Sequence, residues 1–399
     1  MTARRGSGSP RRASRLSSTA ATVLDARPTA PGTYPAVLVF MEIFGVNHHI
    51  RSVADRVAAE GYVALAPDVF HRTAPGIELK YDADGLAKGI AFMGQVTTTE
   101  AMADVSAALA YLKGRSEVGG RGTGAMGFCF GGHLTYLSAC DWLARESMRV
   151  LLEPLGLRTP PVLTYLENGE GAAILRADQP LWDGRSLSPV AAIRLVRHNL
   201  FRPTSLIHET GHQAAHVVAW VPELAAALET GLSGSELGPL WGGWASEIAA
   251  DAYAFVHTGY AALAALHDVL AVGADSVLRV RRQDPHPTGY VRVLLGHAMC
   301  RRFFGAGHWD GMAQAWTHVY RLEEADAESG GLLSASVPRL PAIAEIVLER
   351  PFRAFRGKSL SELIDPLRVR PDALEALARA GGRALYTSSD WLRRESLRL

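Results

Sequence analysis

The sequence has little that would cross-link the chain or attach it to a membrane. Its 399 residues include only three cysteines, which cannot form a disulfide framework and favour a reducing compartment, so we expect a cytoplasmic protein. No run of about 18 uncharged apolar residues occurs, and we therefore expect no membrane span. Lys and Arg (41) nearly balance Asp and Glu (40), which disfavours binding to nucleic acid through a broad basic face.

What is present is the composition of a globular protein. The chain is 48% hydrophobic and 20% charged, and its length favours two or three domains. One segment departs from this average, because the first sixteen residues carry five arginines, no acidic residue and many Ser, Gly and Pro. We therefore expect residues 1–21 to form a disordered tail.

The first folded region, residues 22–140, alternates between strand and helix patterns. Continuous apolar runs predict buried strands, and amphipathic stretches that end near glycine predict helices. The expected strands are 34–41, 62–66 and 124–128, and the expected helices are 50–60, 99–113 and 131–140. This alternation predicts an α/β domain with a parallel sheet.

A cysteine stands where this region expects a strand to turn into a helix. Gly127-Phe128-Cys129-Phe130-Gly131-Gly132 has the pattern glycine, any residue, nucleophile, any residue, glycine. The sharp turn requires small flanking residues, and the helix N-terminus lowers the pKa of a thiol. The backbone N–H of Phe130 would then face a developing oxyanion. A buried structural cysteine beside a tight turn is the alternative interpretation.

These residues and two other segments carry a family resemblance. With Met41-Glu42-Ile43-Phe44-Gly45 and the Ala-Leu-Ala-Pro-Asp-Val-Phe segment at 64–70, the cysteine motif resembles the dienelactone hydrolase family of α/β-hydrolases over residues 22–140. The resemblance implies that Cys129 is the nucleophile, that the Glu42 carboxylate contacts it, and that the region of Ile43 supplies a second oxyanion donor. It ends at the nucleophile helix, and no counterpart of the family's Asp and His follows in the sequence.

Beyond residue 140 the pattern becomes mainly helical. We expect a domain at 141–328, with a small β hairpin of residues 162–166 and 172–176 around Asn168-Gly169, and then helices. These helices are expected at about 189–200, 204–220, 244–270, 287–303 and 311–321. A Gly/Ser-rich linker at 329–336 and a helical extension complete the expected domain 329–399.

One internal repeat supports a boundary near residue 140. Residues 141–149 (DWLARESMR) recur at 390–398 (DWLRRESLR) with seven of nine positions identical. The period is too long for a solenoid. The repeat marks either the two ends of one module or the start of a second copy, and the sequence does not decide between these meanings.

The mainly helical region contains a metal-binding pattern, His208-Glu209-Thr210-Gly211-His212. The two histidines are four residues apart, so they lie on one helix face and can share a metal. Glu209 lies beside them, where it could take a proton from a metal-bound water. His216 continues the stripe but lies about 12 Å from His208 along the helix, too far to share that metal.

A second helix offers a third ligand. Glu247 and Asp251 are four residues apart among small residues, so Glu247 can ligate zinc and Asp251 can accept an N–H from a ligand histidine. The two motifs resemble gluzincin metallopeptidases over residues 200–260. The resemblance implies that His208, His212 and Glu247 bind Zn²⁺, with Glu209 as general base.

Two further residues of this region are candidates for the oxyanion. His286 and Tyr290 follow on a loop that enters a helix, and either could donate to a tetrahedral oxyanion, although local helix capping explains them equally well. A simpler interpretation of the whole region is two amphipathic helices whose acids and imidazoles are solvated or paired.

The leading functional hypothesis is therefore a zinc-dependent, peptidase-like hydrolase fused to a partial α/β-hydrolase. Its substrate would be a small molecule or a peptide, and its oligomeric state is open. The second hypothesis is an esterase or lactonase that uses Cys129. The third is a non-catalytic fusion or docking protein in which the zinc is structural.

Overall fold

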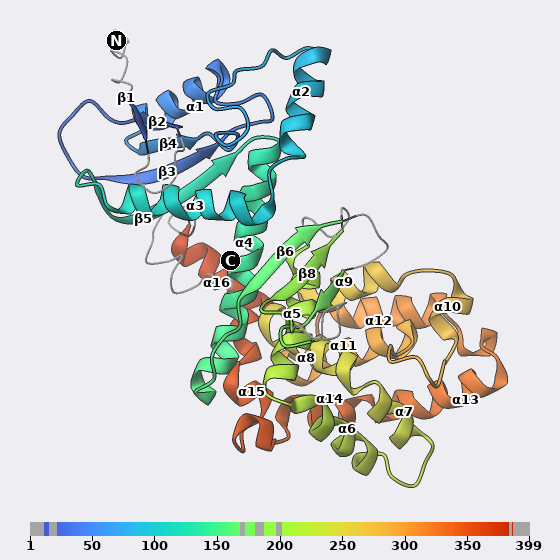
Figure 1. Cartoon of the computed structure of the whole chain (residues 1–399). Coiled ribbons are helices and arrows are strands. Elements are labelled where there is room, and N and C mark those ends of the chain that lie inside the picture. Colours follow the sequence, from blue (N-terminus) through green and yellow to red (C-terminus); the bar gives the residue numbers. More distant parts are fainter. Residues whose placement is uncertain are drawn as a thin grey trace, which may run out of the picture. The chain divides into compact units, whose positions relative to one another are not determined.

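The computed structural model describes residues 12–15, 22–167, 172–179, 187–196, 202–382 and 385. The chain divides into two compact units, Met1–Ala139 and Cys140–Leu399 (Figure 1). Helix α4 (Phe130–Leu152) begins in the first unit and continues into the second. Each unit has its own hydrophobic core, so each is described by itself.

The first unit is built on a mixed five-stranded sheet with the strand order β1-β2-β4-β3-β5. The strands are β1 (Arg12–Arg15), β2 (Thr22–Ala26), β3 (Tyr34–Phe40), β4 (Val63–Pro67) and β5 (Val118–Gly127). Strand β3 is parallel to both β4 and β5, as expected, whereas β1 and β2 pair in antiparallel fashion. The expectation of a disordered tail is wrong for Arg12–Arg15, because pairing with β2 satisfies the backbone of this polar segment. Residues 1–11 and 16–21 lie outside the described part.

Three helices cover the two faces of this sheet. They are α1 (His48–Ala59), α2 (Ala83–Met93) and α3 (Thr98–Lys113), of which α2 is not predicted from the sequence. Successive residues of β4 alternate between the faces: Ala64 and Ala66 join the core under α1, and Val63 and Leu65 join the core under α3. Burial on both faces explains why β4 is a continuous apolar run.

The second unit contains a smaller sheet that differs from the predicted hairpin. Strands β6 (Val162–Leu166), β8 (Ala191–Leu195) and β7 (Ala173–Leu175) lie in that order, so β6 and β7 are not neighbours. Strand β8 is parallel to β6 and antiparallel to β7. The helix expected at 189–200 is therefore wrong for 191–195, where buried and half-buried residues alternate with the period of a strand. The Asn168-Gly169 turn lies outside the described residues.

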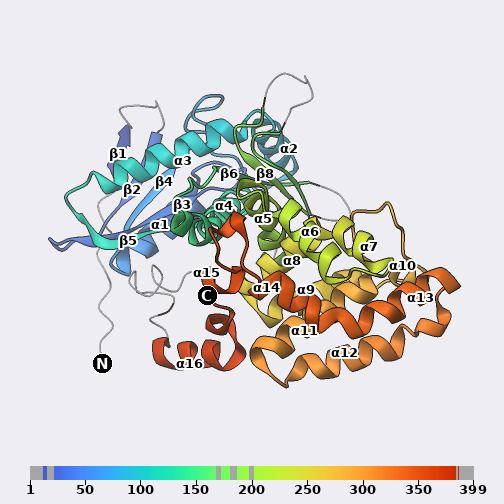
Figure 2. The same ribbon diagram turned by 90° about the horizontal axis from the view of Figure 1, so that it is seen from below.

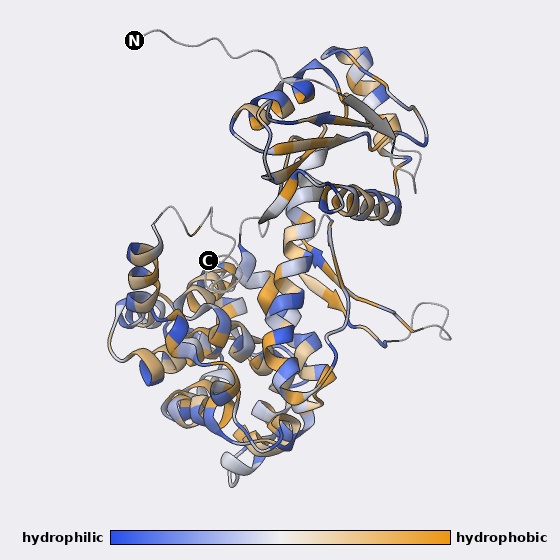
Figure 3. Ribbon diagram, turned by 90° about the vertical axis from the view of Figure 1, so that its left-hand side faces the viewer, coloured by the Kyte–Doolittle hydropathy of each residue, from blue (hydrophilic) through white to orange (hydrophobic). Residues whose placement is uncertain are grey.

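The remainder of the second unit is helical (Figure 2). Orange and blue stretches alternate along its helices, as in amphipathic helices packed around a core (Figure 3). The α-helices are α5 (Pro203–Val217), α6 (Trp220–Gly231), α7 (Leu237–Gly243), α8 (Ala245–Thr258), α9 (Tyr260–Leu270), α10 (Ala274–Leu278), α11 (Gly289–Phe304), α12 (His308–Val319), α13 (Ala327–Ser336), α14 (Leu340–Glu349), α15 (Leu360–Leu363) and α16 (Pro371–Gly381).

The segment expected to be a linker is helix α13. Its N-terminus is capped by Asp326, which accepts a hydrogen bond from the backbone N–H of Ser329 at 2.9 Å. Leu332 and Leu333 are buried in the core of the second unit, and this burial outweighs the low helix propensity of the Gly and Ser residues. The same core extends to Ile364, so residues 329–364 are not a separate extension.

One helical stretch, Ala327–Glu349, is long and apolar enough to cross a membrane by length and composition alone. This finding differs from the expectation of no such segment. The stretch consists of α13, a short 3-10 turn and α14. On α14, Ile343, Ala344 and Val347 are buried in the core, and a core helix passes the same test of length and composition.

Helix α8 buries a histidine in this core. The His257 Nε2 atom has no hydrogen-bond partner within the described part of the chain, and the ring packs 4.6 Å from that of Tyr253. Burial, assisted by the positive charge of Arg368, lowers the pKa of His257 to about 3. The folded chain therefore holds this imidazole neutral, whereas the unfolded chain protonates it near pH 6.5.

We expect His257 to make the second unit less stable as the pH falls. Between about pH 6.5 and 3 the unfolded chain binds one more proton at this position, which costs about 2 kcal/mol of folding free energy at pH 5. His257→Phe should remove that loss, as measured by urea unfolding at pH 7.5 and 5. All eight tryptophans follow Ala139, so tryptophan fluorescence follows the second unit. The exposed His318→Phe serves as control, and an equal pH dependence in both variants would contradict the assignment.

Candidate functional site

Cys129 occupies a strained turn between β5 and α4. It is exposed, and its φ of 51° lies in the left-handed region, which costs a non-glycine residue about 1–3 kcal/mol. A Cβ on Gly127 would lie 2.3 Å from the backbone of Gly131, and a Cβ on Gly131 would lie 2.5 Å from the Cβ of Phe40. Only glycine fits at these two positions. The turn therefore has the geometry of a nucleophile elbow, with Phe130 as the first residue of the helix.

The segment after β3 lies against this elbow. The N–H of Gly131 donates to the carbonyl of Met41 at 3.1 Å, which joins the turn to the residues before Glu42. Ile43 is buried, and its backbone carbonyl packs closely against α2. A Cβ on Gly89 of α2 would lie 2.5 Å from the Ile43 carbonyl oxygen. The region expected to supply a second oxyanion donor is thus held beside the turn, although no donor atom is assigned.

Glu42 has a different partner from the one that the family resemblance implies. The hydroxyl of Tyr81 donates a hydrogen bond to the Glu42 carboxylate and accepts one from Asn47 at 3.0 Å. Burial and the Glu42 carboxylate raise the pKa of Tyr81. Among the described hydrogen bonds, none joins Glu42 to Cys129. The Tyr81 hydroxyl therefore occupies one oxygen of the Glu42 carboxylate.

An imidazole lies close to the elbow, although the sequence did not single it out. His49 is in the first turn of α1, and its ring packs edge-on against Phe128, the residue before Cys129, with 5.2 Å between ring centres. This neighbour comes from tertiary packing, so no spacing along the sequence could have indicated it.

In the second unit, two helices meet closely at the predicted metal-binding residues. Gly211 lies between His208 and His212 on α5, and a Cβ there would lie 2.9 Å from the Cα of Ala250 on α8. A larger side chain at this position would force the helices apart. The glycine therefore allows the histidines of α5 to reach the carboxylates of α8.

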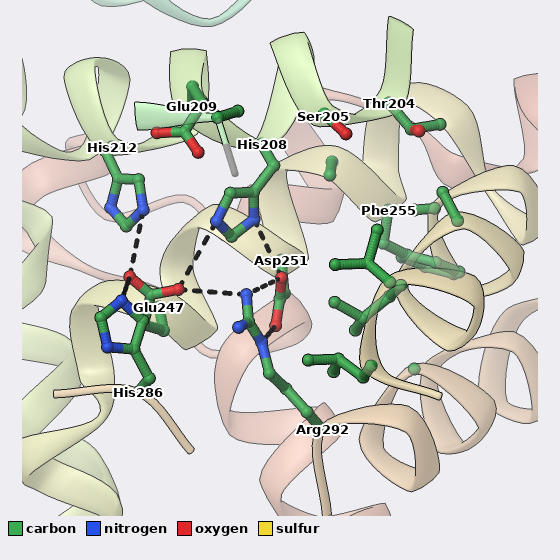
Figure 4. Close-up of a pocket in the computed structure, with 18 of the residues that line it drawn as sticks. Thr204, Ser205, His208, Glu209, His212, Glu247, Asp251, Phe255, His286 and Arg292 are labelled. Carbon is green, nitrogen blue, oxygen red and sulfur yellow. Dashed lines mark hydrogen bonds and ion pairs between the residues drawn. The ribbon is translucent and has the colours of Figure 1, made fainter. Parts of the chain in front are cut away.

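His208, His212 and Glu247 form a group whose ligand atoms lie within 4.8 Å of one another (Figure 4). The Glu247 carboxylate is 3.5 Å from His208 Nε2 and 3.2 Å from His212 Nε2. Two ligands of a tetrahedral zinc ion, each about 2.0–2.1 Å from the metal, are about 3.3 Å apart. Two imidazoles and one carboxylate are also a ligand set that zinc accepts at sites with an open position. The residues present therefore fit zinc.

Asp251 orients one of these histidines, as predicted. Its carboxylate accepts a hydrogen bond from His208 Nδ1 at 2.9 Å, which directs Nε2 toward Glu247. Burial by itself lowers the pKa of His208, but the hydrogen bonds with Asp251 and Glu247 outweigh it and raise that pKa to about 9. The site thus favours positive charge at this imidazole. His212 has a weaker support, since its Nδ1 lies 3.3 Å from the hydroxyl of Ser246.

Arg292 is a member of the site that the sequence analysis missed. This buried guanidinium on α11 donates to both oxygens of Asp251, at 2.6 and 2.9 Å, and lies 3.0 Å from Glu247. The carboxylates of Glu209, Glu247 and Asp251, together with this guanidinium, carry a net charge of −2 when the imidazoles are neutral. A divalent ion would cancel that charge. An arginine within the apolar stretch Tyr-Val-Arg-Val-Leu-Leu was the available signal, because buried charges need partners.

Glu209 and His286 complete the polar end of the site. Glu209 is 8% exposed and lies beside the two histidines, and burial raises its pKa, which makes it a better proton acceptor. His286 Nδ1 hydrogen-bonds Asp284 at 2.8 Å, and its Nε2 is 3.6 Å from Glu247 (Figure 4). Tyr290 is a correction to the predicted set: it is 4% exposed, packs in the core, and does not line the cavity.

The first unit has the features of one enzyme class. A parallel strand that ends in an exposed cysteine at a strained turn, followed at once by a helix, defines the nucleophile elbow of α/β-hydrolases. The profile of the dienelactone hydrolase family matches residues 21–145. A “Putative carboxymethylenebutenolidase” of Synechocystis sp. is 46% identical over 190 residues, which cover 44% of this chain and 76% of that protein. The chain therefore belongs to the dienelactone hydrolase family and is a hydrolase.

Other relatives match over a smaller share of their length. A carboxymethylenebutenolidase of Pseudomonas sp. is 35% identical over 117 residues, 29% of this chain and 49% of that protein, so the chain spans about half of this relative. A solved dienelactone hydrolase-like promiscuous phosphotriesterase from metagenomic libraries is 28% identical, with a TM-score of 0.28, over 33% of this chain and 56% of that structure. The family profile ends at residue 145 and does not reach the metal-ligand group.

We expect Asp251→Asn to weaken zinc binding by about 10–100-fold, because the amide no longer holds His208 by a charged hydrogen bond. The measurement is competition for zinc against a chromophoric chelator. Asp275→Asn, at an exposed position of α10, is the matched control. Equal zinc affinity in the Asp251 variant and the control would contradict an orienting role for Asp251.

Proposed function

We propose that the second unit is a zinc-dependent hydrolase that cleaves peptide-like amides. The observation that carries this proposal is the convergence of His208, His212 and Glu247 at zinc-ligand spacing with Glu209 beside them. A purely structural zinc site is closed by four protein ligands, whereas this group has three among the residues that the structure describes. The adjoining cavity of about 710 Å³ gives a substrate access to the same residues.

The described side chains can divide the reaction among them. Zinc, when bound, would polarise the substrate carbonyl and make water more acidic. Glu209 would accept a proton from the attacking water while the water oxygen adds to the carbonyl carbon of the substrate. The C–N bond then breaks, and Glu209 returns the proton to the leaving amine, so that the products are a carboxylic acid and an amine. His286 would donate a hydrogen bond to the carbonyl oxygen as negative charge develops there.

Asp251 and Arg292 would act through other residues. Asp251 holds His208, and Arg292 holds Asp251 and Glu247 in place. These contacts keep the histidine tautomer and the carboxylate position constant through the reaction.

A second candidate function belongs to the first unit. The exposed Cys129 on a strained turn before a helix would act as the nucleophile that opens an ester or lactone. The thiolate sulfur would bond to the carbonyl carbon, the alkoxide would leave and take a proton from water, and hydrolysis of the thioester would restore the thiol.

We expect Glu209→Gln to keep zinc and to lose at least about 100-fold in amide turnover, because the amide cannot accept the proton. Zinc content by atomic absorption and hydrolysis of a peptide library test both parts. Glu375→Gln, an exposed glutamate of α16, should behave like the wild type. Turnover that persists in the Glu209 variant would argue against the assigned base. A zinc-loaded wild type without any turnover would favour the structural-zinc alternative.

Thiol alkylation and chelation separate the two candidate activities. Cys140 and Cys300 are buried, so iodoacetamide should modify Cys129 first. Amide hydrolysis should survive alkylation and stop on chelation of zinc, whereas ester or lactone hydrolysis should respond in the opposite way. Cys129→Ala should reproduce the effect of alkylation. Loss of amide hydrolysis on alkylation, with zinc retained, would exclude an independent site in the second unit.

A further inference from the structure

The cavity beside the metal-ligand group has an apolar end. Its walls include Phe255 of α8, Leu263, Leu266 and Val269 of α9, and Leu295 and Met299 of α11. Helix α9 is mostly apolar, and Leu263 is its only buried residue; its other leucines are half-buried, and Val269 is 45% exposed. Accessible apolar surface that is continuous with a polar reaction centre is typical of a pocket for an aliphatic or aromatic group.

The same cavity is lined by a cationic side chain, Arg176, that has no role in the metal-ligand group. Arg176, directly after β7, lines the cavity, and its guanidinium has no hydrogen bond or ion pair with any residue that the structure describes. The other guanidinium of the cavity, Arg292, is already engaged by Asp251 and Glu247. Arg176 is thus available to pair with an anion supplied by a ligand.

The metal-binding helix itself holds Arg176 in position. The backbone N–H of Ala177, the next residue, donates to the buried side chain of Gln213 at 2.9 Å, and Gln213 follows His212 on α5. Burial and the charge of Arg176 lower the pKa of His216, so the guanidinium lies near the last turn of α5. Arg176 therefore lies near the C-terminal end of α5, lines the same cavity as the metal-ligand group, and stands on a different element from the apolar helix α9.

We propose that the substrate is an amide with a free carboxylate that pairs with Arg176 and an apolar acyl group that lies against α9 and α11. An N-acylated amino acid is the simplest molecule of this class, since its scissile carbonyl stands between the two groups. This assignment rests on the proposed function, because it places that carbonyl at the metal-ligand group. Hydrolysis would yield a fatty or aromatic carboxylic acid and a free amino acid.

The test compares N-octanoylglycine with N-octanoylglycinamide, which differ only in the carboxylate, and with N-acetylglycine, which lacks the apolar chain. Binding is measured by calorimetry to the full-length Glu209→Gln protein, with zinc and after chelation, so that no turnover is needed. We expect the acid to bind at least about tenfold more tightly than its amide. N-acetylglycine lacks six methylenes of the octanoyl chain and should bind on the order of 1,000-fold more weakly, because each buried methylene contributes about 0.8 kcal/mol.

Arg176→Gln should abolish the preference for the acid, and Arg176→Lys should retain part of it. Arg350→Gln, an exposed arginine that does not line the cavity, is the matched control and should leave both affinities unchanged. The preference should persist after chelation, because it comes from Arg176 and not from zinc. Equal binding of acid and amide, or a preference that Arg176→Gln leaves intact, would overturn the inference.

The outcomes separate this inference from the proposed function. Loss of turnover in Glu209→Gln together with equal binding of acid and amide would leave a zinc hydrolase of other specificity. An acid preference that depends on Arg176, together with unchanged turnover in Glu209→Gln, would instead keep the ligand class and remove the proposed catalytic role.

Discussion

The close approach of α5 and α8 is the constraint on which the candidate metal centre depends. Gly211 leaves room for the backbone of α8, and the two histidines on either side of it then reach Glu247 and Asp251. A side chain at Gly211 would separate the helices and lengthen every ligand distance at once. The same helix also anchors the cavity wall through Gln213. The interface between α5 and α8 therefore fixes both the packing of these helices and the positions of the candidate metal ligands.

Charge balance is the second condition for this arrangement. Glu247 and Asp251 are mostly buried, and burying carboxylates is costly unless each has partners. Arg292 neutralises part of their charge, and His208 supplies hydrogen bonds. A divalent ion would complete the balance. This explains why an arginine stands in an otherwise apolar helix and why the three helices α5, α8 and α11 all contribute.

The first unit concentrates its strain at one residue. Cys129 is held in a left-handed conformation by a turn that only glycines on both sides permit. Beside this turn, Tyr81 donates a hydrogen bond to Glu42, and His49 packs edge-on against Phe128. The chain thus belongs to a hydrolase family through one unit and carries a separate candidate site in the other.

The sequence determined those features that depend on neighbours along the chain. The Gly-x-Cys-x-Gly turn, the strands around it and the i, i+4 pairs His208/His212 and Glu247/Asp251 follow from local periodicity and backbone sterics, and the structure describes them close to the expected positions. The helix expected at 189–200 contains strand β8, and the linker expected at 329–336 is helix α13, because pairing and burial there overrode local propensity.

Only the tertiary structure decided what depends on packing between distant segments. The order β6-β8-β7, the role of Arg292 and the placing of Arg176 beside α5 join residues that lie far apart in the chain. Tyr290 was a site candidate because of its position in the sequence, but its side chain packs in the core. Periodicity indicates which face of a helix is apolar, but not which other helix it meets.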